Sequence, residues 1–153
     1  MTLNLNGQVH QKWLKQWIVR CKSQVDFLVV GVHWGIELRA KPTPYQVALG
    51  HALIDDGADL VYGCHPHVLE GAVLYKGKPI LYSMGNLVSP TFATGGIVKL
   101  NFQSRQLRSC HFLPIVIKFG RAYPLFRDPR AVAKMNQLDR VACLKGVDVP
   151  IKF

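Results

Sequence analysis

The residues of this sequence best suited to chemistry are three histidines. His33 opens "HWG", and His65 and His67 flank a proline in "GCHPHVLEG". Neutral imidazole is a ligand for zinc, manganese and iron, and two imidazoles at positions i and i+2 can reach one ion. Two ordinary loop histidines would give the same local pattern. The proline predicts an extended conformation for His65 and fixes the spacing of the pair.

Two polar residues near these histidines are candidates for catalysis. Glu37 follows His33 by four positions and could orient a ligand or act as a general base; it could equally be a solvated loop acid. Asn86 ends "SMGN", where a side-chain amide follows a flexible glycine, and the simpler interpretation there is a turn. His51 lies in a predicted helix and is interpreted as a surface histidine.

The segments before the first histidine predict a helix and a strand. Residues 8–22 have the apolar spacing of an amphipathic helix. Its expected packing face consists of Val9, Trp13, Trp17 and Ile18. Residues 25–32, "VDFLVVGV", form a near-continuous apolar run, which predicts a strand buried on both faces, as in parallel sheets.

A second helix has strong boundary signals. Thr43, Pro44 and Gln46 have the spacing of a capping box with proline at the first helical position, and Gly57 is a typical helix end. A short apolar strand, "DLVYG", follows. Strand, helix and strand within about 40 residues predict a βαβ unit with parallel strands. Since ligands bind beyond the carboxyl ends of such strands, the three histidines are expected to converge there.

The remainder of the chain predicts mostly antiparallel strands. "AVLYKGKPILYS" indicates a hairpin that turns at residues 76–78, and residues 96–102 and 107–119 read as further strands. Asp128 and Pro129 mark the start of a last helix. The predicted fold class is therefore an α/β sandwich, with a βαβ unit followed by antiparallel strands and a C-terminal helix.

The composition limits the kinds of partner. Nineteen basic and nine acidic residues give a net charge of +10 among 153 residues, which favours an acidic polymer or a phosphate-bearing substrate. No nucleic-acid-binding motif accompanies this charge, so no nucleic acid is expected. The four cysteines form no CxxC pair, and no apolar run reaches the ~18 residues of a membrane span. These features indicate reduced thiols, a cytoplasmic chain and no transmembrane segment.

A set of motifs between Phe27 and Val88 resembles a known family. "HWG" with its glutamate, "HPHV", "YKGKPI" and "YSMGN" are similar to the C-terminal half of CapA-type proteins, the poly-γ-glutamate capsule-synthesis family, which is related to calcineurin-like metallophosphoesterases. The resemblance implies a four-layer α/β/β/α sandwich and a divalent metal, manganese, zinc or iron. It implies that His33, His65 and His67 bind this metal, with Glu37 and Asn86 near the site.

The family pattern also has parts without a counterpart in this sequence, namely an N-terminal Gly–Asp element and further acidic and asparagine ligands. Residues 1–153 are therefore expected to form a single CapA-like domain, truncated at its N-terminus, with an incomplete site for one metal ion. A missing N-terminal half or a partner chain would complete it. The expected function is a metal half-site in polyanion biosynthesis, with cell-envelope association by family resemblance. A non-catalytic module that binds acidic polymer, or an inactive fragment, stays an alternative.

Overall fold

Within the part of the chain that the structure describes, two helices and two β-sheets form an α/β sandwich, which confirms the predicted fold class. The structure is a computed structural model that describes residues 8–104 and 106–124. Its elements are α1 (Gln8–Lys22), β1 (Val29–His33), α2 (Pro44–Asp55), β2 (Leu60–Cys64), β3 (Leu69–Tyr75), β4 (Lys78–Met84), β5 (Ala93–Gln103), β6 (Gln106–Lys118) and β7 (Arg121–Pro124). The helix predicted from Asp128 lies outside the described residues, and the extent of the domain stays a prediction.

The first sheet has the strand order β1-β2-β4-β3. Strands β1 and β2 are parallel and are connected by α2, so the βαβ unit is confirmed. Strand β4 is parallel to β2, and β3 pairs with it in antiparallel orientation at the far edge. The turn of this β3–β4 hairpin is Lys76–Gly77, as predicted. In register, His33 lies opposite Cys64, so the carboxyl ends of β1 and β2 are neighbours.

The capping box of α2 is present as predicted. The Gln46 amide N–H donates to Thr43 Oγ1 over 3.2 Å, and the Thr43 amide N–H donates to Gln46 Oε1 over 2.8 Å. At the other end, Asp55 and Asp56 oppose the helix dipole. Each has a distant partner, because Asp55 pairs with Lys76 and Asp56 with Lys15.

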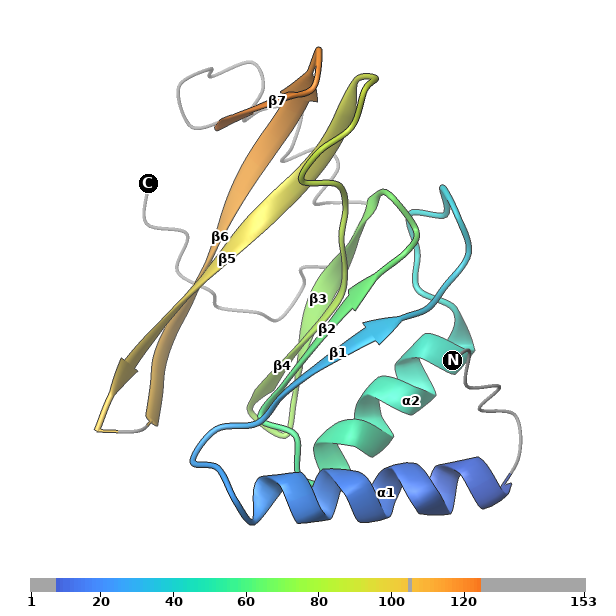
Figure 1. The fold of residues 1–153 in the computed structure, drawn as a ribbon, viewed down its shortest axis with the longest axis vertical. Helices are drawn as coiled ribbons and strands as arrows, with labels where there is room; N and C mark the ends of the chain where they lie inside the picture. Colours follow the sequence, from blue (N-terminus) through green and yellow to red (C-terminus); the bar gives the residue numbers. More distant parts are fainter. Residues whose placement is uncertain (1–7, 105, 125–153) are drawn as a thin grey trace.

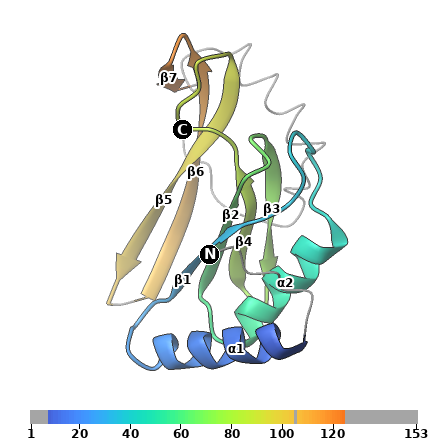
Figure 2. The same cartoon turned by 45° about the vertical axis from the view of Figure 1, so that its right-hand side comes forward.

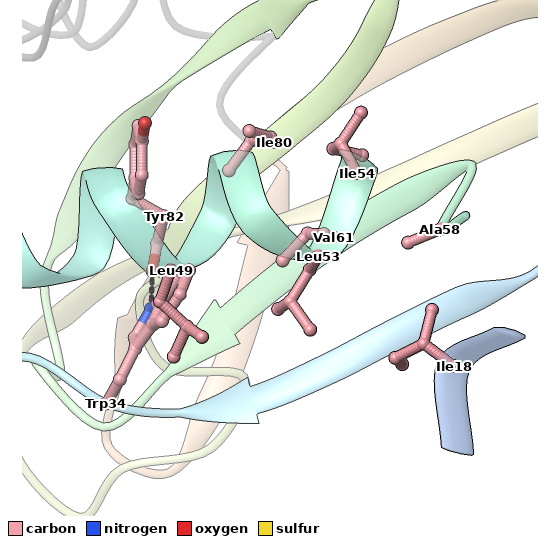
Figure 3. Packing of buried hydrophobic residues seen from close by; sticks show 9 residues of the cluster. All are labelled: Ile18, Trp34, Leu49, Leu53, Ile54, Ala58, Val61, Ile80 and Tyr82. Atoms are coloured by element: carbon pink, nitrogen blue, oxygen red, sulfur yellow. Dashed lines mark hydrogen bonds between the residues drawn. The ribbon is translucent and has the colours of Figure 1, made fainter. Parts of the chain in front are cut away.

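The main core lies between the two helices and the first sheet, and Figure 3 shows its packing. It consists of Ile18, Trp34, Leu49, Leu53, Ile54, Ala58, Val61, Ile80 and Tyr82. Alternate residues of β2 and β4 face this core, as the two-residue period of a strand requires. Figures 1 and 2 show the second sheet, order β5-β6-β7, on the opposite side of the first sheet from α2.

The space between the two sheets is only partly filled. A hollow of about 280 Å³ separates them, lined by Val29, Leu60, Tyr62, Leu81, Met84, Val98 and Leu100. Strand β1 is an edge strand beside it, and Val29 is 42% exposed. The predicted strand is present as β1, but the expectation that it starts at residue 25 and is buried on both faces was wrong. The strand begins at residue 29, and only one of its faces meets the helices.

Helix α1 also differs from the prediction in its buried face. Ile18 is in the core and Leu14 packs against it, but Trp13 and Trp17 are 45% and 46% exposed. The two indole rings contact each other on the outer surface, with centroids 5.9 Å apart. Spacing alone grouped the tryptophans with Ile18, whereas the helix turns them away from the sheet. Within the described ranges, no helix combines the length and the apolar character needed to cross a membrane.

Candidate functional site

The site lies beyond the carboxyl ends of β1 and β2, and buried tryptophan packing positions it. Trp34, directly after His33, is 5% exposed, and its Nε1–H donates to the Tyr82 carbonyl over 2.7 Å (Figure 3). Its amide N–H donates to the Cys64 carbonyl over 3.1 Å. These bonds fasten the end of β1 to β2 and β4. The side chain of His33 therefore stands at an exposed edge on a fixed backbone.

The His65–Pro66–His67 loop has an unusual backbone. Pro66 is fully buried, whereas His65 has φ 107° and His67 has φ 60°. The prediction of an ordinary extended His65 was wrong, because its φ is positive. Non-glycine residues avoid positive φ, and such conformations cost about 1–3 kcal/mol each unless their surroundings impose them. Two of them around one buried proline indicate a loop that is held in place by tertiary contacts.

The structure brings the three predicted histidines together. The ring centroids of His33 and His65 are 4.7 Å apart, and those of His65 and His67 are 6.2 Å apart. His33 and His67 are exposed and His65 is half-buried. The convergence expected from the βαβ topology is therefore present. Each ring can meet a ligand from solvent.

Asn86 joins this group, as the sequence predicted. His67 Nδ1 lies 2.7 Å from Asn86 Oδ1, and because a carbonyl oxygen only accepts, the imidazole donates. The Asn86 backbone is fixed in turn, since its amide N–H donates to the Thr94 carbonyl over 3.1 Å. Gly85, with φ 66°, makes the turn that allows this approach. In the neutral imidazole, a proton on Nδ1 leaves the lone pair on Nε2.

Glu37 and Ser83 have different surroundings from Asn86. Glu37 is exposed in the loop after β1, and within the described part of the chain it makes no hydrogen bond or ion pair. Its catalytic role stays a prediction. Ser83 is 3% exposed, and its hydroxyl donates to the Val68 carbonyl over 2.6 Å. The hydroxyl of "SMGN" therefore ties β4 to the loop and has a structural role.

Three residues near the site were not among the predicted functional residues. Cys64 Sγ lies 3.5 Å from His33 Nδ1, and burial raises the pKa of this thiol. Gln46 and Glu70 are both fully buried, with 2.6 Å between Gln46 Nε2 and Glu70 Oε2. Burial raises the pKa of Glu70, against the opposing effects of the Gln46 bond and the Arg39 charge. Glu70 and Ala72 share the buried face of β3, but no pattern in the sequence marks this carboxyl as inward.

The types and the arrangement of the three imidazoles differ in how well they suit a divalent metal. Imidazole nitrogens suit a single zinc, manganese or iron ion, and the His67–Asn86 bond leaves Nε2 of His67 available, so the donor types fit. Their present arrangement is not that of a formed site. Among residues 8–104 and 106–124, no group of three or more His, Cys, Asp or Glu side chains could hold a metal ion as it stands. Binding therefore requires rotation of at least one exposed imidazole.

Comparison with known proteins identifies the family. A model of the family described as "Bacterial capsule synthesis protein PGA_cap" matches residues 3–91, more than half of the chain. The chain belongs to this family. The expected resemblance is thereby confirmed, and the matched range contains the three histidines, Glu37 and Asn86.

Individual proteins are similar to part of this chain. It is 42% identical over 87 residues to a capsule biosynthesis protein CapA of Bacillus anthracis, a match that covers 57% of this chain and 21% of the relative. It is 45% identical over 71 residues to a PGA biosynthesis protein CapA of Bacillus subtilis, which covers 46% and 19%. A probable polyglutamine synthesis accessory protein of Mycobacterium tuberculosis is 39% identical over 75 residues, covering 49% and 20%. The matched segment thus spans about a fifth of each of these relatives.

Proposed function

We propose that this chain supplies a histidine-based half-site for one divalent metal ion in a protein of capsular poly-γ-glutamate synthesis. The observation that carries the proposal is the meeting of His33, His65 and His67 at the carboxyl ends of two adjacent parallel strands. The relatives named for capsule and PGA biosynthesis support the polymer context. Association with the cell envelope is part of the same proposal.

Each residue has a defined part in this proposal. His33, His65 and His67 provide nitrogen ligands, and Asn86 fixes the ring orientation of His67 by accepting from its Nδ1–H. Exposure of the rings leaves room for an oxygen of the substrate. A bound divalent metal would polarise a phosphoryl or carboxyl oxygen as a Lewis acid. Glu37 is the candidate general base, from an exposed position in the loop after β1.

The charge of the chain supports an acidic substrate. The net charge of +10 attracts polyanions such as poly-γ-glutamate, and this attraction weakens as salt increases. The same charge supports the second candidate function, a module that binds acidic polymer without metal chemistry. Metal dependence distinguishes the two candidate functions, because only the first requires a metal ion and the three histidines.

The deciding experiment is a calorimetric titration of the purified chain with Mn²⁺ and Zn²⁺. Stoichiometric binding by the wild type that is lost in a His33→Ala/His65→Ala/His67→Ala variant is the expected result. The matched control is His51→Ala. His51 stacks on Tyr75, with ring centroids 3.8 Å apart, and its loss should leave metal affinity unchanged.

A second titration, with poly-γ-glutamate, separates the two candidate functions. Tighter polymer binding in the presence of Mn²⁺, abolished by the triple substitution, supports the metal half-site. Binding that is equal with and without metal, and that falls steeply with salt, supports the polymer-binding module. A folded wild-type chain that binds neither metal ion would refute the proposed metal function.

A further inference from the structure

A buried carboxyl group lies in the layer beneath the metal-site loop. Glu70, on β3, has no exposed surface, and its Oε2 accepts from Gln46 Nε2 over 2.6 Å. Its Oε1 has no hydrogen-bond partner among the described residues. Buried polar atoms nearly always have partners, so an unpaired carboxyl oxygen requires an explanation. The proposed metal chemistry does not use this residue.

Gln46 connects Glu70 to the start of α2. Its side chain is fully buried and uses both of its polar ends. Oε1 accepts from the Thr43 amide in the capping box, and Nε2 donates to Glu70. One amide therefore links the first turn of α2 to β3. Rotation of this amide would break a hydrogen bond at each end, so its orientation is fixed.

Gly35 and Pro66 connect the Gln46–Glu70 pair to the loop that contains His65 and His67. A Cβ atom on Gly35 would lie 2.8 Å from Gln46 Nε2 and 3.0 Å from Pro66 Cγ, so the glycine backbone is packed between them. Gly35 has φ 90°, which also favours glycine. Pro66 is itself fully buried, and its carbonyl accepts from the Leu38 amide over 2.8 Å. Contacts thus run from Glu70 to the proline between the two histidines.

The backbone of the His65–Pro66–His67 loop has conformations that need support from the surrounding structure. His65, His67 and Leu38 all have positive φ values, of 107°, 60° and 59°. Backbone in this region persists only where the surrounding structure imposes it. The surroundings here are the buried Pro66 and the groups packed against it. The unpaired oxygen of Glu70 fits this interpretation, since strain and incomplete pairing are tolerated at functional sites.

We propose that the buried Gln46–Glu70 pair is the positioning device of the His65–Pro66–His67 loop. It fixes α2 and β3 relative to each other, seats Pro66, and so presents His65 and His67 toward His33. Glu70 is a positioning residue because it acts through Gln46 and Pro66. The consequence for metal affinity rests on the proposed metal function, whereas the consequence for loop order does not.

Two variants of Glu70 test this proposal. Glu70→Met keeps the volume but removes the acceptor for Gln46, and Glu70→Gln keeps an oxygen that accepts. Mn²⁺ affinity measured by calorimetry should fall about tenfold or more in Glu70→Met, as for residues that orient metal ligands. It should stay near the wild-type value in Glu70→Gln. Leu53→Ala, in the core between α2 and the sheet, is the control for general loss of stability.

Hydrogen exchange of the Leu38 amide gives a readout that needs no metal. Because this amide donates to Pro66, its exchange should become faster in Glu70→Met and stay slow in Glu70→Gln and Leu53→Ala. Unchanged Leu38 exchange in a folded Glu70→Met chain would overturn the proposal. Equal losses of Mn²⁺ affinity in Glu70→Met and Leu53→Ala would also overturn it. If the wild type bound no metal, the proposed function would fail, and Leu38 exchange would still decide the role of the pair.

Discussion

The side chain of Asn86 fixes the imidazole of His67, with 2.7 Å between Asn86 Oδ1 and His67 Nδ1. The two residues are 19 positions apart and follow β2 and β4, two parallel neighbouring strands of the first sheet. The bond selects the tautomer with the proton on Nδ1, because the amide oxygen can only accept. In the neutral imidazole, this tautomer keeps the lone pair on Nε2. Histidine ligands of metals commonly have such a partner on the other ring nitrogen.

Substitution Asn86→Ala should therefore weaken metal binding without unfolding the chain. We expect the Mn²⁺ affinity to fall on the order of 10-fold to 100-fold, the usual effect of losing a partner of a histidine ligand. Calorimetric titration measures the affinity, and the melting temperature checks the fold. Asn101→Ala is the matched control, because the Asn101 amide donates to Ser109 on the second sheet. A similar loss of affinity in Asn101→Ala would contradict this assignment.

Cys64 should report whether the histidines are occupied. Its Sγ lies 3.5 Å from His33 Nδ1 and the residue is exposed, so a ligand on His33 should shield the thiol. We expect Mn²⁺ to slow the reaction of Cys64 with a disulfide reagent. Mn²⁺ is preferred to Zn²⁺ for this test because it has little affinity for thiolate.

The other cysteines set the background of this labelling measurement. The rate for Cys64 is the difference between the wild type and Cys64→Ser. Cys21 and Cys110 are half-buried, and together with Cys143 they supply the background that the Cys64→Ser chain retains. Protection that persists in the Cys64→Ser chain would show that the metal acts elsewhere.

The topology of the site followed from the sequence because its signals are local. The capping box at Thr43 and Gln46 and the apolar runs on either side of α2 define a βαβ unit, and this unit alone places His33 beside the "HPH" loop. The turn at Lys76–Gly77 was equally local. Structural features that depend on residues close together in the chain can be predicted from the sequence.

The details that could not be predicted depend on distant residues. The positive φ of His65 departs from the preference of a residue before proline, at a Pro66 that is fully buried and packed close to Gly35. Burial of Glu70 depends on an amide from another element. The exposure of Trp13 is set by the rotation of α1 against the sheet. The groups that determine the environment of each of these residues are distant from it in the sequence, so local patterns could not predict that environment.

Gly63→Ala should destabilise the chain through lack of space. A Cβ atom at Gly63 would lie 2.0 Å from both Trp34 Nε1 and the Tyr82 carbonyl oxygen, which bond to each other. The hydrogen bond and the adjoining backbone must move apart, and we expect a loss of about 3 kcal/mol in the free energy of unfolding. Urea denaturation measures it. Gly77→Ala is the control, since its Cβ would meet nothing within 4 Å and only the positive φ opposes it.

Asp59 should make stability depend on acid pH. Its carboxylate accepts from Lys22 Nζ over 2.7 Å and from the Leu28 amide over 2.8 Å, and Lys78 Nζ lies 3.1 Å away. Burial opposes ionisation of Asp59, but these partners outweigh it and lower its pKa below the ordinary value. Folding therefore favours the ionised form. The stabilisation is complete above the ordinary pKa of about 3.9 and is lost as pH falls through the lower folded value.

Asp59→Asn should accordingly cost about 2 kcal/mol in the free energy of unfolding at pH 7. This difference from the wild type should shrink below about pH 4, since the wild-type carboxylate then takes up a proton as well. Urea denaturation at several pH values between 7 and 3 measures both quantities. Asp55→Asn is the matched control and should cost much less, because the Asp55–Lys76 pair is exposed to solvent. A cost for Asp59→Asn that stayed constant down to pH 3 would mean that shape, rather than charge, makes Asp59 stabilising.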